Sequence, residues 1–595
     1  MWDRLSKTAW VLGVSLVLGS ATWSPAQQQS SQPQQVTVSA DEVRDLESQF
    51  RTLQQNYIDL QKSIINSGGL SGISGDARWK DVDNMQKDID DLKKQKEQVL
   101  QQLDDLKKNA AATPPPAAAA TAGGDLMSKF KDALLLNDSQ STGINMVWTL
   151  ICGFLVMFMQ CGFAMVETGF TRAKNVAHTM SMNLMVYAIG MIGYWFSGFA
   201  IQFGGTAAKG SCSTVTTLGS SVTDHLTGLS GLHIGEGFWG IAGNVGFCLP
   251  PSMLSGGIFT LFLFQMVFMG TTNTIPTGAL AERWRFLSFC LYAFVVGALI
   301  YPLYGCWVWG GGWLAALGTN LGLGHGHVDF AGSSVVHLCG GTIAFIGAKM
   351  LGARIGKYNK DGSSNPIPGH NLPMGVVGTF ILAFGWFGFN PGSTLEGMNA
   401  QIGVIAVNTM LASAAGAVTG MVTTWIRFRR PDPSFMCNGM LGGLVAITAP
   451  CAFVDSWAAV LIGAIAGVVV VFAAMIVDEK LKVDDPVGAV AVHGACGLWG
   501  VLALGLFANG QYGEGWNSVA GKVTGLFYGD PGQFLAEVIG AATCIAVVGG
   551  LAWLMFTTLE KLVGNRSAVA DELHGLDIPE FGVLGYQPDK HPESK

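Results

Sequence analysis

The sequence predicts an all-α polytopic membrane protein: eleven transmembrane helices with a five-plus-five inverted repeat, preceded by an extracytoplasmic helical coiled-coil hairpin. Three observations lead to this fold class. Of the 595 residues, 49% are hydrophobic and only 13% are charged, whereas about 25% of the residues of a soluble domain are charged. Eleven long apolar stretches follow one another from residue 143 onward. Two of these stretches share one spacing of an Asp and a His.

The first residues, 1–26, have the pattern of a secretory signal peptide. Arg4 and Lys7 precede an apolar run from Ala9 to Gly19, and Ser24-Pro25-Ala26 offers a cleavage site. An uncleaved anchor is the alternative, but the run is short for a membrane span. Cleavage would leave the mature N-terminus outside the cytoplasm.

Residues 27–111 are predicted to form an extracytoplasmic coiled-coil region. Apolar residues repeat with heptad spacing over 46–64 and again over 82–106, and the glycine-rich segment 68–75 separates the two runs. An antiparallel hairpin fits this order, and a parallel bundle between protomers is the alternative. Residues 112–142 are predicted to be a semi-rigid Ala/Pro-rich linker followed by a short interfacial segment.

The membrane domain is predicted over residues 143–559, with the tail 560–595 behind it. Its spans lie at roughly 143–168, 176–203, 256–280, 286–314, 328–351, 372–391, 400–425, 435–452, 454–477, 486–508 and 532–558. With the first span starting outside, the inner loops receive twelve Lys and Arg residues, whereas the outer loops receive only Lys209 and Lys522. This bias predicts an extracytoplasmic N-terminus and a cytoplasmic tail.

Two segments, DFAGSSVVHLCGG and DDPVGAVAVHGACG, carry the shared spacing. Asp329 stands eight residues before His337, and Asp485 stands eight residues before His493. Each His alone would be an ordinary buried core residue, but the repeated spacing favours a functional pair. The loop charges make the two segments run in opposite directions, as in an inverted repeat, where transport sites lie near the membrane midplane. Eight helical residues rise about 12 Å, which puts each His well inside the bilayer.

Six motifs within residues 143–586 resemble the ammonium transporter/Rh superfamily, on its ammonium transporter branch. They are GFAMVETGFTRAKN (162–175), GALAERWRF (278–286), VWGGGWL (308–314), DFAGSSVVH (329–337), GWFGFNPGS (385–393) and DDPVGAVAVHGACG (484–497). The resemblance implies a homotrimer in the lipid bilayer with one pore per protomer, and ammonium or ammonia as the transported species. It also implies that the N-terminal extension lies outside the family core.

The resemblance assigns roles to matching positions. Ammonium would bind at an outer site above a gate of two stacked phenyl rings and be deprotonated there. Ammonia and the proton would then move in parallel along two neutral imidazoles. Potassium has a similar size and charge, so a desolvating apolar pore, not ion size, would separate the two ions. The implied residues are Trp309, Ser393, Phe268 and Asp329 at the binding site, Phe268 and Phe389 at the gate, and His337 and His493 in the pore.

The motif that contains Ser393 and the C-terminal tail lead to further expectations. Pro391 stands in GFNPGS where many family members carry a small residue, which bears on how Ser393 is presented. The tail resembles the family's cytoplasmic C-terminal motif, which packs beneath neighbouring protomers and can engage a PII-type regulatory protein. Its matching positions are Gly575, Asp577, Gly582 and Tyr586, while Phe581 replaces a common His. A simple solvated tail is the alternative.

Among the eleven cysteines, Cys212 and Cys248 share one long outer loop and are candidates for a disulfide. The alternative is that Cys248 is buried at the edge of a span. No nucleophile–base set and no metal-ligand cluster is visible in the sequence. We therefore expect no enzyme activity, no cofactor, no metal and no nucleic-acid partner.

The predicted function is ammonium transport across the cytoplasmic (inner) membrane of a bacterium. An ammonium sensor with the same core is one alternative, although the few residues after the last span leave little room for a fused signalling domain. An Rh-like channel for neutral ammonia is the other. Trp309 together with Ser393 argues against it, because a neutral gas needs no cation site.

Overall fold

A computed structural model of the chain describes residues 119–207, 215–226, 231–234 and 239–587. The chain divides into two compact units, Met1–Asp125 and Leu126–Lys595, and every described side chain belongs to the second. Ten helical stretches of the described residues are long and apolar enough to cross a membrane, and the shorter apolar helix α15 (Pro433–Ile447) lies at the eighth predicted span. The predicted polytopic helical fold is confirmed.

Several spans consist of consecutive α-helical and π-helical pieces. The first half of the membrane domain contains α4 (Ala119–Phe170), α5–η3–α6 (Val176–Gly193, Tyr194–Gly198, Phe199–Phe203), α8 (Gly256–Leu280), α9–η6–α10 (Phe286–Val295, Val296–Ile300, Tyr301–Val308) and η7–α12 (Ser333–Leu338, Cys339–Leu351). The second half contains α13 (Leu372–Phe389), α14 (Gln401–Phe428), α15, α16–η9 (Ser456–Met475, Ile476–Lys480), η10–α17 (Val490–Ala495, Cys496–Phe507) and α18–η13–α19 (Pro531–Thr543, Cys544–Val548, Gly549–Leu562). The short elements include α7 (Ser220–Leu226), the antiparallel strands β1 (Leu232–His233) and β2 (Gly240–Ala242), α11 (Leu317–Leu321), α20 (Val569–His574) and α21 (Asp577–Phe581).

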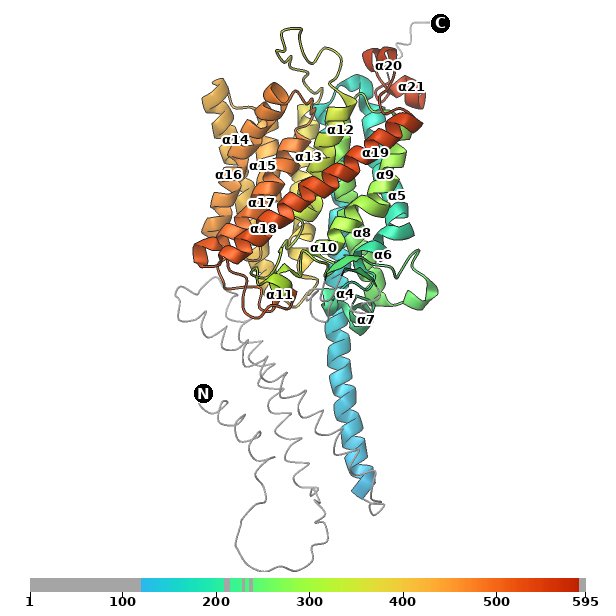
Figure 1. Cartoon of the computed structure of the whole chain (residues 1–595), viewed down its shortest axis with the longest axis vertical. Coiled ribbons are helices and arrows are strands. Elements are labelled where there is room, and N and C mark those ends of the chain that lie inside the picture. The colour runs from blue at the N-terminus through green and yellow to red at the C-terminus, as the bar shows by residue number, and fades with distance from the viewer. Residues whose placement is uncertain (1–118, 208–214, 227–230, 235–238, 588–595) are drawn as a thin grey trace, which may run out of the picture. The chain divides into compact units, whose positions relative to one another are not determined.

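The short elements gather at opposite ends of the helix bundle, with α7 and α11 at one end and the tail helices α20 and α21 at the other (Figure 1). The chain enters η7 from the α11 end, because α11 immediately precedes it. It enters η10 from the end where the tail lies. Asp484, just before η10, binds Arg354, and Ile355, the neighbour of Arg354 in sequence, donates its N–H to Glu572 of α20. The two Asp–His segments therefore enter the membrane domain from opposite ends, as an inverted repeat requires.

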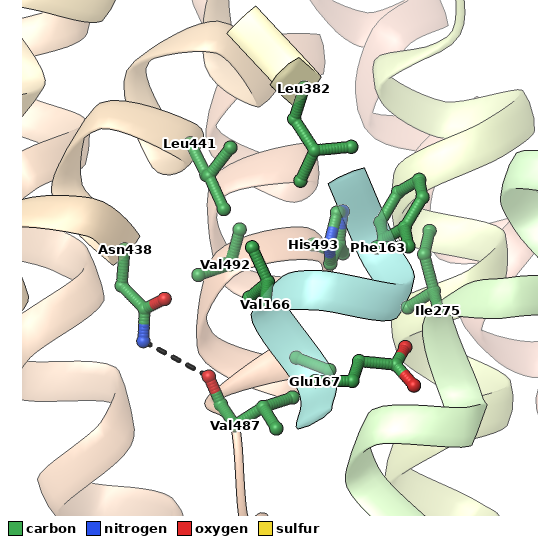
Figure 2. Close-up of a pocket in the computed structure, with 11 residues that line it drawn as sticks. Phe163, Val166, Glu167, Ile275, Leu382, Asn438, Leu441, Val487, Val492 and His493 are labelled. Atoms are coloured by element: carbon green, nitrogen blue, oxygen red, sulfur yellow. Dashed lines mark hydrogen bonds between the residues drawn. The ribbon is translucent and has the colours of Figure 1, made fainter. Parts of the chain in front are cut away.

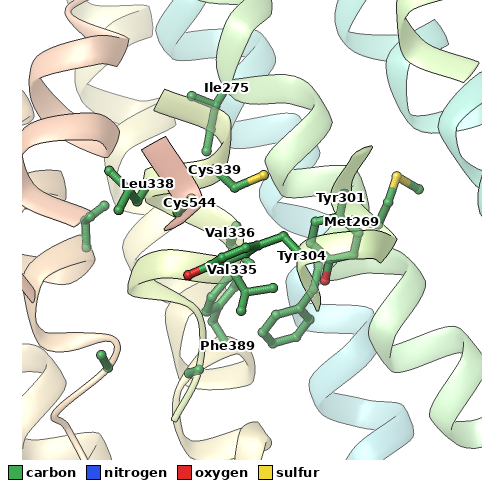
Figure 3. Close-up of a cluster of buried hydrophobic side chains, with 14 of the residues drawn as sticks. Met269, Ile275, Tyr301, Tyr304, Val335, Val336, Leu338, Cys339, Phe389 and Cys544 are labelled. Carbon is green, nitrogen blue, oxygen red and sulfur yellow. The ribbon is translucent and has the colours of Figure 1, made fainter. Parts of the chain in front are cut away.

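Apolar side chains surround the segment that carries His337. Val335 and Val336 of η7 lie in a buried cluster that also contains Tyr301 and Tyr304 from the fourth span and Phe389 from the sixth (Figure 3). All five side chains are almost completely buried. The histidine is thus held in the packed interior of the bundle and away from its lipid-facing surface.

The start of the first span differs from the prediction. α4 is continuous from Ala119 to Phe170, so the end of the predicted linker and the predicted interfacial segment belong to the same helix as the span. Alanine has the highest helix propensity, which explains why the Ala-rich stretch is helical. The predicted signal peptide, the coiled-coil region and Cys212 lie outside the described residues and stay predictions.

Candidate functional site

The predicted pore residues form a column of aromatic rings. Trp309, at the end of α10, lies edge-on to Phe268 of α8, with 5.9 Å between ring centroids. Phe268 stacks on Phe389, the last residue of α13, at 4.1 Å. Phe389 lies 5.4 Å from the ring of His337, which lies 5.3 Å from the ring of His493. Four residues from four different motifs, together with Phe268, which lies outside the motifs, are therefore joined by one continuous series of ring contacts.

The two phenyl rings close this column. Phe268 and Phe389 are both buried, and their ring planes are inclined by only 29°. Phe264, one helical turn before Phe268, packs against it at 4.6 Å. Stacked rings in van der Waals contact leave no room for a hydrated ion, so passage requires that the rings move.

Ser393 joins the column through Phe389. It lies in η8, a short 3₁₀ helix (Pro391–Thr394) that follows α13, and its hydroxyl donates to the Phe389 carbonyl at 2.7 Å. That bond uses the single hydroxyl proton, so the oxygen can still accept a hydrogen bond from an incoming donor. Pro391 opens the short helix, a position where a missing N–H is tolerated. The proline is therefore compatible with the predicted role of Ser393.

Asp329 lies next to the column, and its carboxylate accepts hydrogen bonds from the start of η7. One carboxylate oxygen accepts the N–H groups of Gly332 and Ser333, and the other accepts from Ser334, through both N–H and hydroxyl, and from Val335. These five bonds are 2.7–3.0 Å long. Asp329 is thus the cap of η7, the π-helical turn that carries His337. Its backbone carbonyl accepts the Trp309 indole N–H at 2.7 Å.

Asp485 repeats this arrangement at the other end of the bundle. Its carboxylate accepts the backbone N–H groups of Gly488, Ala489 and Val490 at 2.7–3.1 Å, where η10 begins. η10 is again a π-helical turn, and it carries His493. Each Asp therefore fixes the start of the helix whose His it precedes in sequence.

The two histidines meet at the centre of the column. The Nδ1 atoms of His337 and His493 are 3.2 Å apart, so one ring donates a proton and the other accepts it. Trp386, which the sequence did not single out, stacks on His337 at 5.3 Å, and Phe163 lies 6.1 Å from His493. Aromatic rings therefore shield the imidazole pair. When both imidazoles are neutral, one of their two N–H protons lies in the hydrogen bond between them.

His493 also lines a small cavity of about 20 Å³, which is large enough for one water or ammonia molecule (Figure 2). Its walls are mainly apolar, and Glu167 and Asn438 are the polar residues besides His493. The lining residues are Phe163, Val166, Glu167, Ile275, Leu382, Asn438, Leu441, Val487, Ala489, Val492 and His493. Sequence reasoning missed Glu167, although an acid inside an apolar span was a visible signal.

A buried ion-pair network holds the segment that leads into η10. Arg354 donates to both oxygens of Asp484 at 2.8 and 2.9 Å and lies 3.2 Å from Glu282, which also pairs with Arg172. Burial favours the neutral form of Asp484, but Arg354 and Arg283 outweigh it and hold the pKa of Asp484 well below its usual range. Burial lowers the pKa of Arg283 to about 10.

The predicted tail residues contact the membrane domain of the same protomer. Gly575 has φ +111°, and a Cβ there would lie 2.4 Å from the Lys174 carbonyl oxygen, so the position requires glycine. Asp577 accepts the backbone N–H of His178 at 2.9 Å and that of Gly585 at 3.0 Å. One carboxylate thus joins α21, the end of the tail and the first turn of α5.

Tyr586 and Lys174 complete this attachment. The Tyr586 hydroxyl lies 2.9 Å from His370 Nε2, and His370 Nδ1 lies 2.8 Å from the Thr171 carbonyl. The Lys174 ammonium donates to the backbone carbonyl of Glu572 at 2.7 Å, at the C-terminal half of α20. The tail up to residue 587 is therefore folded onto its own protomer, which argues against a simple solvated tail.

The remaining candidates are cysteines and metal ligands. Cys248 is half-buried, and its thiol lies 3.6 Å from the Phe196 carbonyl oxygen. Its predicted pairing with Cys212 falls outside the described residues. Within the part of the chain that the structure describes, no group of three or more His, Cys, Asp or Glu residues is arranged to hold a metal ion.

Comparison with known proteins relates the chain to transporters of one kind. The model of the Ammonium Transporter Family matches residues 147–586. Ammonium transporter Amt2 of Archaeoglobus fulgidus is 45% identical over 453 residues, covering 76% of this chain and 90% of that protein. Ammonium transporter Amt1 of Haloferax mediterranei is 35% identical over 456 residues, covering 75% of this chain and 79% of that protein.

Solved structures of proteins named Amt and Mep2 have a similar fold. A structure described as a sensor Amt protein superposes with a TM-score of 0.63 and 33% identity, covering 74% of this chain and 99% of that one. Mep2 of Candida albicans shares the fold, with a TM-score of 0.60 and 24% identity, over 76% of this chain and 92% of that one. Since the family model spans most of the chain and these relatives are so similar, the chain belongs to the ammonium transporter family.

Proposed function

We propose that this protein transports ammonium across a membrane. The observation that carries the proposal is the column from Trp309 through Phe268 and Phe389 to the His337–His493 pair. The names of the relatives support it, since two proteins that are 45% and 35% identical to this chain are named ammonium transporters.

In the proposed mechanism, an ammonium ion first binds outside the phenyl rings. The face of the Trp309 ring attracts a cation by about 0.5–2 kcal/mol, and the Ser393 oxygen accepts one of its N–H groups. The closed rings of Phe268 and Phe389 then impose a desolvation penalty on any bare cation. An ion that can release a proton avoids this penalty, which separates ammonium from potassium.

Beyond the rings, the imidazole pair lines the path of neutral ammonia. The hydrogen bond between His337 and His493 offers the released proton a parallel route, because neutral imidazoles accept and donate protons near neutral pH. Ammonia and a proton would thus cross together, and transport would carry charge.

The decisive experiment measures current with purified protein in liposomes. We expect an ammonium pulse to produce an inward current and a potassium pulse to produce none. Replacing both His337 and His493 by Ala should reduce the ammonium current by about 100-fold, the low end of the effect of losing positioned proton-transfer groups. Unchanged, selective current in that double variant would disprove the relay.

The same measurement tests the two alternatives. The similarity to the sensor Amt protein favours a sensor as the second candidate, and ammonium binding without current would support it. Ammonia flux without charge movement would support a neutral gas channel.

We also propose an orientation in the membrane, an oligomeric state and a partner protein. The basic loop residues Arg172, Arg283 and Arg354 lie at the tail end of the bundle, which supports a cytoplasmic tail. The membrane we propose is the inner membrane of a bacterium. Large apolar side chains exposed on α4, such as Phe154 and Phe158, fit either lipid or the predicted trimer contact. Exposed side chains of α20 and α21 offer a surface for a PII-type protein.

A further inference from the structure

Glu167, in the last turn of α4, is an acid for which the ring column provides no role. Its side chain is buried, with only 3% of the residue exposed. Its hydrogen bonds come from neutral groups, Asn183 of α5 at 2.7 Å and Thr277 of α8 at 2.8 Å. The charged neighbour that acts on it is another acid, Asp485. An ionised carboxylate without a counter-ion is costly in such surroundings.

The hydrogen bonds around Thr277 indicate that Glu167 holds a proton. The Thr277 hydroxyl oxygen lies 2.8 Å from both carboxylate oxygens and 2.6 Å from the Thr274 carbonyl oxygen. A hydroxyl has one proton, so it can donate only one of these bonds. If Glu167 is neutral, Thr277 donates to Thr274 and Glu167 donates to Thr277. Asn183 donates to Oε2 and thereby leaves Oε1 as the protonated oxygen.

Glu167 also shares a chamber with a pore histidine. Glu167 and His493 both line the cavity of about 20 Å³ (Figure 2), which has room for a single water or ammonia molecule. Apart from Asn438, the rest of the lining is apolar. His493, Glu167 and Asn438 are therefore the residues with polar side chains in the wall of this cavity.

We propose that Glu167 is the inner proton-exchange group of the pore. This inference deepens the proposed transport function and rests on it. Neutral Glu167 gives its proton to ammonia arriving in the cavity, which forms ammonium and leaves a carboxylate. The carboxylate then takes a proton from the His493 imidazolium through the small molecule between them. That step restores the acid and the neutral imidazole, and each cycle delivers one ammonium ion.

Glu167→Gln is a sharp test, because an amide copies the shape of the neutral acid. Its NH₂ can donate to Thr277 and its oxygen can accept from Asn183, so we expect the variant to fold. We expect its ammonium current in liposomes to fall at least about tenfold, since a positioned proton-transfer group is lost. Glu167→Asp, which keeps an exchangeable proton, should recover part of the current. Glu479→Gln makes the same change at an exposed position of η9 and should leave the current unchanged.

Infrared difference spectroscopy of the full chain provides a readout independent of transport. Wild-type protein should show the carbonyl band of a protonated carboxylic acid, and Glu167→Gln should lack it. The inference is overturned if Glu167→Gln keeps more than half of the wild-type current, if its infrared spectrum matches that of the wild type, or if Glu167→Asp loses as much current as Glu167→Gln. Failure of the proposed function would differ from these results, because the wild-type protein itself would then give no current.

Discussion

At the scale of single residues, the two aspartates stabilise helix starts. Asp329 accepts five hydrogen bonds and Asp485 accepts three, all from the turn that leads to a pore histidine. A carboxylate whose two oxygens are occupied by N–H groups has little capacity left to bind a cation directly. Asp329 therefore acts on the outer site through the backbone, because its own carbonyl oxygen orients the Trp309 indole.

This role predicts a stability defect in Asp329→Asn. An amide has one accepting oxygen and an NH₂ group, so at least two of the N–H donors around Asp329 would face another donor. Each unsatisfied buried group costs about 1–3 kcal/mol, so for two such groups we expect the unfolding free energy to fall by about 2–6 kcal/mol. The unfolding midpoint in detergent measures this change.

Asp530→Asn is the matched control. Asp530 caps α18 with one hydrogen bond to Gln533 N–H at 3.0 Å, and Asn is as good an N-cap as Asp. We expect its midpoint to stay close to that of the wild type. Equal midpoints for Asp329→Asn and Asp530→Asn would contradict the capping role.

How far this site could be predicted depends on the kind of signal. The repeated eight-residue spacing identified His337 and His493, and family motifs identified Phe268 and Phe389, because these signals are local in sequence. The proton arrangement around Glu167 could not be predicted, since it depends on a hydroxyl of α8 and an amide of α5.

At the scale of elements, η7–α12 and η10–α17 are the two helices that carry the pore histidines, and they approach each other closely. A Cβ added at Gly341 would lie 2.3 Å from the backbone nitrogen of Gly494. The sequence predicted both helices but not their π-helical first turns. The hydrogen-bond pattern of a π-turn is selected by packing and has no simple sequence signal.

This crossing predicts that Gly341→Ala damages the site. Because the added methyl meets backbone and no flexible side chain, the two helices must separate, and the 3.2 Å bond between the imidazoles should lengthen. We expect a loss of about 1–3 kcal/mol in stability, as for other overpacked cores, and a clear fall in ammonium current. Thermal unfolding and liposome currents measure the two effects.

Gly494→Ala is the control on the facing helix. Its Cβ would lie 3.7 Å from the nearest atoms of Gly341, which is ordinary van der Waals contact. The methyl should be tolerated, with current and unfolding midpoint near those of the wild type. If both variants behaved alike, the close approach at Gly341 would not be what positions the histidines.

At the scale of the whole molecule, contacts between distant segments join the bundle to its tail. The ten long apolar helices of the described residues, the shorter helix α15 and their order could be predicted from hydropathy alone. The attachment of the tail could not, because residues about 400 positions apart meet there, such as Asp577 with His178 and Leu576 with Asn175. The network of Arg354, Asp484 and Glu282 was missed for the same reason.

The last prediction concerns this attachment. Asp577→Ala removes both acceptors from the His178 and Gly585 amides, and an unsatisfied buried donor costs about 1–3 kcal/mol. Local opening of α20 and α21 should become easier by the same amount, so we expect their amide hydrogens to exchange about 5- to 150-fold faster. Hydrogen–deuterium exchange with mass spectrometry measures this. Asp571→Ala removes a half-buried carboxylate from the same tail without breaking these bonds and should leave the exchange unchanged. Identical exchange in Asp577→Ala and the wild type would mean that Lys174 and Tyr586 hold the tail without Asp577.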